Sequence, residues 1–143
     1  MKIRFIVAFA AVFSAIGFFL AFNFQTTESA GVSLCIMTTF KSSYRQSKAV
    51  FVGEVVGEEK NGDNKTVKFE VEKYWKGANV KNVEINIYET MRYQANFKKG
   101  EKYLIYATAG ENGKLSVGRC SRSLPVTNAA EDLRKLGKGK IPR

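Results

Sequence analysis

The chain has 143 residues, 45% of them hydrophobic, and 23 basic against 13 acidic residues give it a formal net charge of +10. It contains no histidine, which removes the commonest metal ligand and general base and rules out Ser-His-Asp and Cys-His catalytic arrangements. A zinc site would have to combine two cysteines with carboxylates, and no glycine-rich phosphate loop is present. We therefore expect a protein that is not an enzyme, with no cofactor and no metal site.

The first 30 residues have the composition of a secretory signal. Lys2 and Arg4 precede an uncharged apolar run over residues 5–24, and a stretch of polar and small residues follows. Candidate cleavage positions are after Ser29, Gly31 and Ser33. We expect the mature protein to be secreted, either extracellular or periplasmic. Because about twenty apolar residues can also span a bilayer, retention of residues 1–30 as a membrane anchor is the alternative.

After the signal, a short helix and a strand are predicted. The helix covers residues 38–47, where Phe40 and Tyr44 are four apart and share a face. The β-branched run 49–56 predicts a mostly buried strand, and the glycine inside it, Gly53, indicates a bulge or bend.

The segment 58–64 is predicted to be a polar turn, in which Asn61-Gly62 is a strong hairpin signal. The returning strand alternates apolar and charged residues, with Val67, Phe69 and Val71 expected to face inward. Trp75 is expected to continue this inward phase, and Lys76-Gly77 to turn the chain.

Three further strands and a helix are expected towards the C-terminus. The strands cover residues 83–87, 103–107 and 115–117, and the 89–100 connection carries Phe97. The pattern then becomes helical, with Asn128 as the predicted N-cap and Gly137 at the stop position. Three residues form the predicted apolar face of this helix: Ala129, Leu133 and Leu136.

These elements predict a mainly β domain with flanking helices. We assign residues 31–137 to one domain, a five-stranded antiparallel OB-fold barrel, with a flatter sandwich as the alternative. The basic tail 138–143 is expected to be flexible.

The order and spacing of four segments resemble the netrin-like family, and more closely the single-domain secreted relatives of the tissue inhibitors of metalloproteinases. The segments are Val50-Phe51-Val52-Gly53-Glu54-Val55, Phe69-x-Val71-x-x-x-Trp75-Lys76-Gly77, Gly100-x-x-Tyr103-Leu104-Ile105-Tyr106 and Cys120-Ser121-Arg122. The resemblance runs from Cys35 to about Leu136, and the fold it implies is an OB barrel with flanking helices.

The resemblance also implies a mechanism and a partner. In the inhibitors, the first mature residue is a cysteine whose α-amino group and carbonyl oxygen chelate the zinc of a metalloproteinase. Carried onto this chain, the inhibitory edge would be Cys35, Ile36, Met37 and Thr38, with Thr39 beside it. The chain has Cys35-Ile36-Met37 where the inhibitors have Cys-x-Cys, and Cys35 becomes the first residue only if cleavage follows Leu34.

Cys35 and Cys120 are the only two cysteines. In an oxidising compartment we expect them to form a disulfide that closes a loop of roughly 85 residues and stabilises the fold by about 4 kcal/mol. Two free thiols in a reducing compartment are the alternative.

The basic composition favours an alternative function, binding of an anionic polymer. The basic surface favours anionic polymers such as polysaccharide or nucleic acid, and aromatic and basic residues are interleaved along the strands. The candidate binding face consists of Tyr74, Trp75, Lys76 and Arg92. Asn64 begins a glycosylation sequon at the predicted hairpin tip, with meaning only in a host that glycosylates. The expected partners are thus an extracellular protein such as a zinc metalloproteinase, or an anionic polymer, with a membrane involved only if the first segment is retained.

Overall fold

The computed structural model describes residues 38–62, 64–88, 96–110, 113–118 and 120–143. The chain divides into two compact units, Met1–Leu34 and Cys35–Arg143, and all described residues belong to the second. The predicted signal, the residues Cys35, Ile36 and Met37, and Arg92 lie outside the described residues. None of the described helices is long and apolar enough to span a bilayer.

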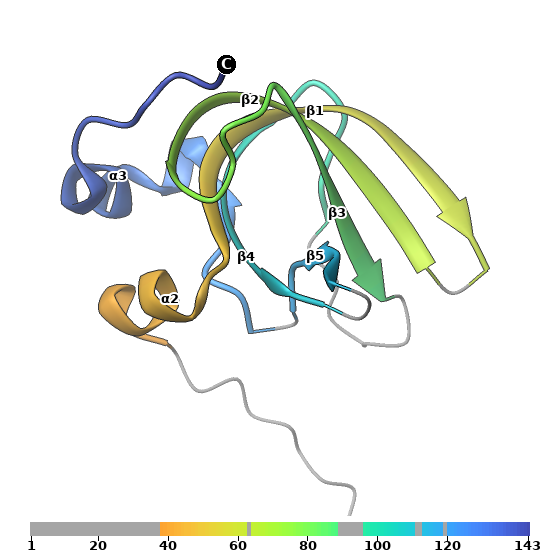
Figure 1. The fold of residues 1–143 in the computed structure, drawn as a ribbon, viewed down its shortest axis with the longest axis horizontal. Coiled ribbons are helices and arrows are strands. Elements are labelled where there is room, and N and C mark those ends of the chain that lie inside the picture. Colours follow the sequence, from red (N-terminus) through yellow and green to blue (C-terminus); the bar gives the residue numbers. More distant parts are fainter. Residues whose placement is uncertain (1–37, 63, 89–95, 111–112, 119) are drawn as a thin grey trace, which may run out of the picture. The chain divides into compact units, whose positions relative to one another are not determined.

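The domain is mainly β with two short helices, as predicted (Figure 1). The helices are α2 (Phe40–Gln46) and α3 (Ala130–Leu136), and a single 3-10 turn, η3 (Val126–Asn128), precedes the latter. The strands are β1 (Ala49–Asn61), β2 (Asn64–Lys76), β3 (Asn82–Tyr88), β4 (Lys102–Ala109), β5 (Leu115–Ser116) and β6 (Leu124–Pro125).

The strands form one sheet that closes on itself. Their order is β1-β2-β3-β5-β4-β6, and β1 pairs with β4 as well as with β2, so that five strands form a ring. The pairings are antiparallel except β3 with β5, which is parallel. The expectation of an all-antiparallel sheet is wrong at this one contact, because β5 approaches β3 after the chain has already turned back from β4.

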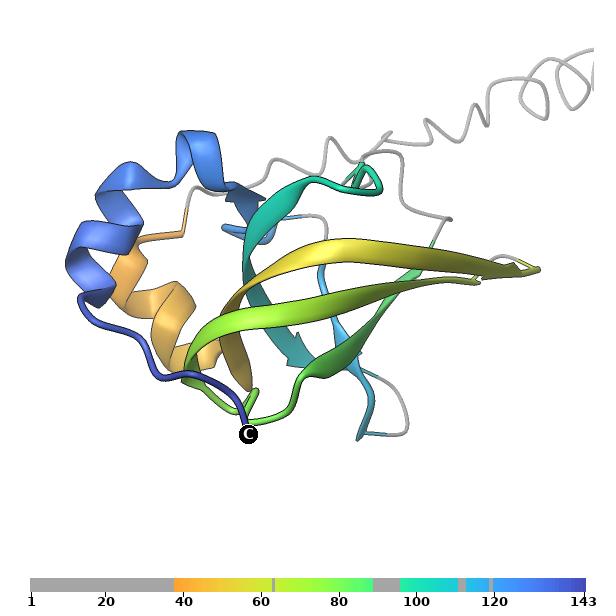
Figure 2. The same ribbon diagram turned by 90° about the horizontal axis from the view of Figure 1, so that it is seen from above.

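Two apolar clusters lie on the two faces of β1 and β4. Phe51, Phe69 and Ile105 belong to the inner cluster, and Val50 and Leu104 to the outer one. Successive residues of a strand face opposite sides, so β1 and β4 supply both clusters and read as continuous apolar runs. The outer cluster is covered by α2 and α3, which lie together on one side of the ring (Figure 2).

The first hairpin confirms the Asn61-Gly62 signal but is longer than predicted. Asn61 pairs with Asn64, and Gly62 has a φ of 60°, so most of the segment predicted as a polar turn belongs to strands. Its charged side chains pair across the two strands, with Lys65 Nζ 2.6 Å from Glu58 Oε2. Ion pairs between β1 and β2 therefore take the place of apolar contacts near the tip of this hairpin.

Gly53 lies at an irregularity of the sheet, as its position predicted, and this irregularity changes the phase of β2. Val52 pairs with Lys73 but Gly53 pairs with Val71, so β2 carries one extra residue between these two positions. Beyond it, Tyr74 packs against the inner cluster and Trp75 against the outer one. The prediction that Trp75 continues the inward phase is wrong for this reason.

The C-terminal helix confirms its predicted apolar face and its stop. Ala129 belongs to the outer cluster, Leu133 and Leu136 pack against it, and Gly137 ends the helix with a φ of 67°. The predicted N-cap is wrong: Asn128 lies in the 3-10 turn, and Ala129 occupies the cap position without a side-chain hydrogen bond.

The expected flexible tail is held to the sheet. The backbone N–H of Tyr74 donates to the carbonyl of Lys140 and the N–H of Lys140 donates to the carbonyl of Tyr74, both at 2.8 Å. The indole Nε1 of Trp75 donates to the carbonyl of Gly137 at 3.1 Å. The segment after α3 therefore extends the edge of β2 by one bridge instead of leaving the surface.

Candidate functional site: the N-terminal edge

The residues that lead into α2 meet the segment after β5 at one surface, which we call the N-terminal edge and define as Thr38, Thr39 and residues 120–122. Thr39 caps the helix, because its Oγ1 accepts from the N–H of Ser42 at 3.3 Å. The hydroxyls of Thr38 and Ser43 are 2.7 Å apart. The first described residues are thus fixed to the helix that follows them.

Arg122 connects the two sides of this edge. Its Nε and Nη2 donate to Oδ2 and Oδ1 of Asp132 at 2.6 and 2.7 Å, a bidentate pair. Its remaining nitrogen, Nη1, donates to the carbonyl of Thr38 at 3.1 Å. Because Asp132 is only 2% exposed, its carboxylate fixes the guanidinium, and the guanidinium in turn fixes the backbone at Thr38.

Tyr106 completes the network beneath the edge. Its hydroxyl donates to Oδ2 of Asp132 at 3.0 Å. Burial opposes ionisation of Asp132, but the hydrogen bonds from Arg122 and Tyr106 outweigh it and lower the pKa of this carboxyl. Burial and the neighbouring carboxylate raise the pKa of Tyr106. Both groups are held in their ordinary states at neutral pH, a carboxylate and a neutral phenol.

A cavity of about 230 Å³ opens beside this network. Thr38, Ser47, Cys120 and Arg122 contribute to its wall. The nearby hydroxyls already serve the fold: Ser47 Oγ donates to the carbonyl of Ser43 at 2.7 Å, and the Oγ of Ser121 to the carbonyl of Tyr106 at 3.2 Å. In the part of the chain that the structure describes, no three His, Cys, Asp or Glu residues gather as a metal site. The carbonyl and hydroxyl groups at this edge are thus held in place by hydrogen bonds within the fold.

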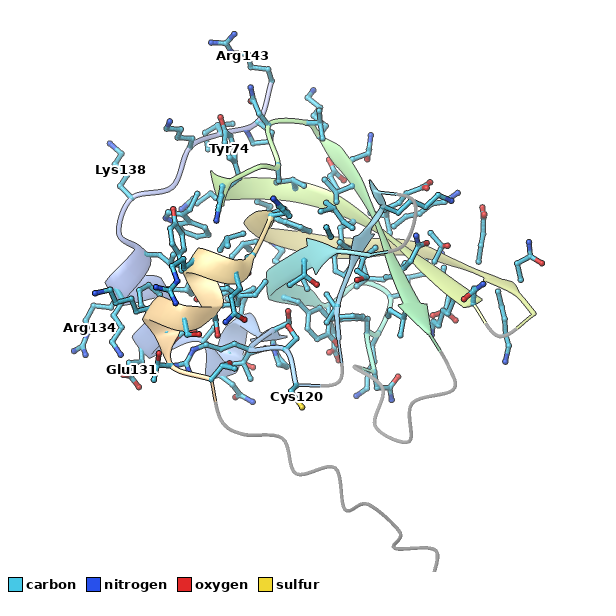
Figure 3. All side chains as sticks on the ribbon, turned by 60° about the horizontal axis from the view of Figure 1, so that its bottom comes forward. Tyr74, Cys120, Glu131, Arg134, Lys138 and Arg143 are labelled. Atoms are coloured by element: carbon cyan, nitrogen blue, oxygen red, sulfur yellow. The ribbon has the colours of Figure 1, made fainter. Side chains whose placement is uncertain are left out.

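The structure locates one of the two cysteines. Cys120 is exposed in the turn that follows β5 (Figure 3), and no cysteine of the described residues is free. Cys35 lies outside the described residues, three positions before Thr38. Three residues reach at most about 10 Å, and Thr38 is bound by Arg122, two positions after Cys120. The Cys35–Cys120 pairing stays a prediction that this proximity favours.

Three of the four residues of the predicted binding face lie in the described part of the chain, and each makes contacts within the fold. Tyr74 and Trp75 pack against opposite clusters. The ammonium of Lys76 donates to the carbonyls of Tyr44 and Arg45 at 3.1 and 3.2 Å, so it stabilises the C-terminal end of α2. The fourth member, Arg92, lies outside the described residues.

The glycosylation prediction falls on an exposed position. Asn64 is the first residue of β2 at the tip of the first hairpin, where a bulky glycan would meet no packed surface.

The ion pair between Asp132 and Arg122 was not predicted from the sequence. The signal was present: Asp132 follows Ala129 by three positions and precedes Leu136 by four, so it lies on the apolar face of the helix. An acidic residue on such a face needs a buried cationic partner. Which of the basic residues would supply it depended on the fold.

No known protein family model matches this chain, and none of the curated proteins is detectably similar to it in sequence.

Proposed function

We propose that this chain is an exported, non-catalytic protein-binding module of the netrin-like type, and that its N-terminal edge contacts the partner in the manner of a metalloproteinase inhibitor. The observation that carries the proposal is the bond from Arg122 to the carbonyl of Thr38. An edge that is rigid before binding loses little conformational entropy when it binds. A bidentate ion pair with a buried carboxylate supplies that rigidity here.

The finer fold assignment, an OB-type barrel, is part of the same proposal. Three features support it: the ring order of the five strands, the closing pairing of β1 with β4, and the parallel contact of β3 with β5. Small barrels of this kind present loops and an open edge for recognition.

The proposed mechanism concerns the residues just before α2. If cleavage follows Leu34, the α-amino group and carbonyl of Cys35 would be the zinc ligands, and Ile36, Met37 and Thr38 would lie beside the partner's active site. The Cys35–Cys120 disulfide and the Arg122 bond would hold the two ends of this short segment. Any residue ahead of Cys35 converts the amine into an amide and removes the lone pair that binds zinc.

The test begins with N-terminal sequencing of the exported protein, followed by inhibition assays on a panel of zinc endopeptidases. Two forms are compared, one that begins at Cys35 and one with a single alanine ahead of it. Inhibition by the first form alone supports zinc chelation, and equal inhibition by both supports binding of the edge without chelation. If neither form inhibits at micromolar concentration, the inhibitor-like function is wrong.

A second candidate, binding of an anionic polymer, is favoured by a specific charge distribution. Residues 38–48 and 129–143, which include both helices and the tail, contain eight basic and two acidic residues. Both acidic residues are already paired, Glu131 with Lys135 and Asp132 with Arg122. Arg134, Lys138 and Arg143 extend from α3 and the tail into solvent (Figure 3). This surface is therefore strongly positive.

Retention on heparin resin tests this candidate. The double substitution Arg45→Gln/Arg134→Gln should lower the salt concentration for elution, because fewer counterions are released on binding. The matched control Lys99→Gln/Lys114→Gln removes the same charge from other loops and should change elution less. Equal effects of the two pairs would mean that only net charge matters, and the assignment to the helical surface would be wrong.

A further inference from the structure

A groove of about 410 Å³ lies on the outer face of the sheet, between β1, β2, α3 and the tail. It is separate from the N-terminal edge and takes no part in the inhibitor-like function proposed above, although its border includes Lys138 of the basic surface. Its apolar wall consists of Val52, Trp75, Val126, Leu133 and Ile141. Trp75, Val126 and Leu133 belong to or pack against the outer cluster but remain partly exposed. The outer cluster is thus incompletely covered at this place.

Ile141 is the feature of the groove that the fold leaves unexplained. It is 69% exposed, the most exposed large hydrophobic residue among those that the structure describes. The neighbouring Lys140 is bridged to Tyr74 by two backbone hydrogen bonds, so the backbone next to Ile141 is fixed at the rim. A fixed tail that exposes an isoleucine beside an open apolar groove adds binding surface at a small entropic cost.

The charges around the groove favour an anion. Lys73 and Lys138 line it, and no carboxylate of the described residues forms an ion pair with either. The one acidic residue in the wall, Glu72, is already paired with Lys102. The groove therefore combines an apolar body with two available cations at its border.

The geometry points to a ligand site for a small amphipathic anion, a molecule with one apolar chain and a terminal carboxylate. The volume lies in the range of small-molecule sites, which are mostly apolar with a few polar groups that orient the ligand. The apolar chain lies against Trp75 and Leu133, and the carboxylate lies between the ammonium groups of Lys73 and Lys138.

The chain supplies its own reporter, because Trp75 is its only tryptophan. Decanoate is titrated into the full domain below its micelle concentration while Trp75 fluorescence is recorded. Decanol and decyltrimethylammonium, with the same chain length and a neutral or positive head, are the matched ligands. The expected result is a saturable change with decanoate, weaker binding of decanol and none of decyltrimethylammonium.

Two sets of substitutions separate the parts of the site. Lys73→Gln/Lys138→Gln should weaken decanoate binding about fivefold to tenfold and leave decanol unchanged. Ile141→Ala, at an exposed position that the folded core does not need, should weaken both ligands about twofold to fivefold. The control pair Lys99→Gln/Lys114→Gln should change neither.

Three results would overturn the inference. The first is the absence of a saturable fluorescence change with decanoate. The second is an equal response to decyltrimethylammonium or an undiminished response of the Lys73/Lys138 variant, since either would mean adsorption without recognition of the anion. The third is a response to vesicles of anionic phospholipid without one to free decanoate, which would assign the surface to membranes.

Discussion

Replacing Arg122 by methionine tests the reasoning about the N-terminal edge most directly. The substitution keeps the length and apolar stem of the side chain but removes both bonds to Asp132 and the bond to the Thr38 carbonyl. It leaves a carboxylate that is 2% exposed, with the Tyr106 hydroxyl as its remaining side-chain donor among the described residues. The free energy of unfolding should therefore fall.

The size of the effect follows from burial. Breaking a buried ion pair by removing one partner costs about 3–5 kcal/mol, because the other charge stays buried without compensation. The Arg122 side chain is 23% exposed, so water can approach the place that it leaves, and we expect the lower end, about 3 kcal/mol. For a domain of this size that corresponds to a fall in Tm of about 12–20 °C.

Urea denaturation of four proteins measures the pair itself: the parent, Arg122→Met, Asp132→Asn and the double variant. Asparagine keeps an oxygen for the Tyr106 hydroxyl and removes the charge, so the double variant should be more stable than additive effects predict, by about 2 kcal/mol. Lys135→Met, which breaks an exposed pair with Glu131, should cost about 0.5 kcal/mol. Additive effects, or equal costs for Arg122→Met and Lys135→Met, would refute the structural role of Arg122.

Three further outcomes are expected. The pKa of Asp132 is lowered in the folded state, so its contribution to stability is present above about pH 4 and is lost as the pH falls through the lowered pKa. The loss of stability at acid pH should therefore be less steep for Asp132→Asn than for the parent. An equally steep loss would contradict this. The pKa of Tyr106 is raised, so its contribution to stability is present below about pH 10 and is lost as the pH rises through the raised pKa. Absorbance titration should therefore show the same number of tyrosines ionising near pH 10 in the parent and in Tyr106→Phe. Gly77→Ala should lower the free energy of unfolding by more than about 2 kcal/mol, because φ is +63° and the new Cβ would lie 2.0 Å from the carbonyl oxygen of Lys48. Gly62→Ala, with a φ of +60° and open space around the new Cβ, should lower it by about 1 kcal/mol. Equal losses in thermal denaturation would show that the close contact at Gly77 is unimportant.

Local patterns were sufficient to predict five of the six strands, although β1 and β2 are longer than expected and β6 was not predicted. The alternation of Val67, Phe69 and Val71 with charged residues defined a half-buried strand, and Asn61-Gly62 defined its hairpin, because both signals depend on residues close in sequence. Gly53 indicated the place of an irregularity but not its consequence. The extra residue lies on the partner strand, and its effect on Trp75 required the pairing register.

The site was less predictable because it depends on contacts between distant segments. Thr38 and Arg122 are 84 positions apart, and nothing near either residue indicates the other. Lys76 was expected on a binding face, yet its ammonium lies at the end of α2, since the register of β2 brings it there. The tail was expected to be flexible from its glycines and charges, and its bridge to Tyr74 uses backbone groups that carry no sequence signal.

The proposed disulfide and the Arg122 bond would close loops of almost the same length, since both join the start of the domain to the segment after β5. Removing them singly and together should therefore separate their effects. A disulfide acts largely by restricting the unfolded chain, whereas the Arg122 bond exists only in the folded state. Reduction of the parent should therefore lower global stability by about 4 kcal/mol and leave the start of α2 attached. The backbone N–H of Ser43, which donates to the carbonyl of Thr39 at 2.9 Å, reports this attachment by hydrogen exchange. Under conditions where the fold persists, its protection should survive either reduction or Arg122→Met and be lost when both are combined. Loss on reduction alone would mean that the ion pair does not hold the edge, and the rigidity on which the proposed binding function depends would then come from the disulfide.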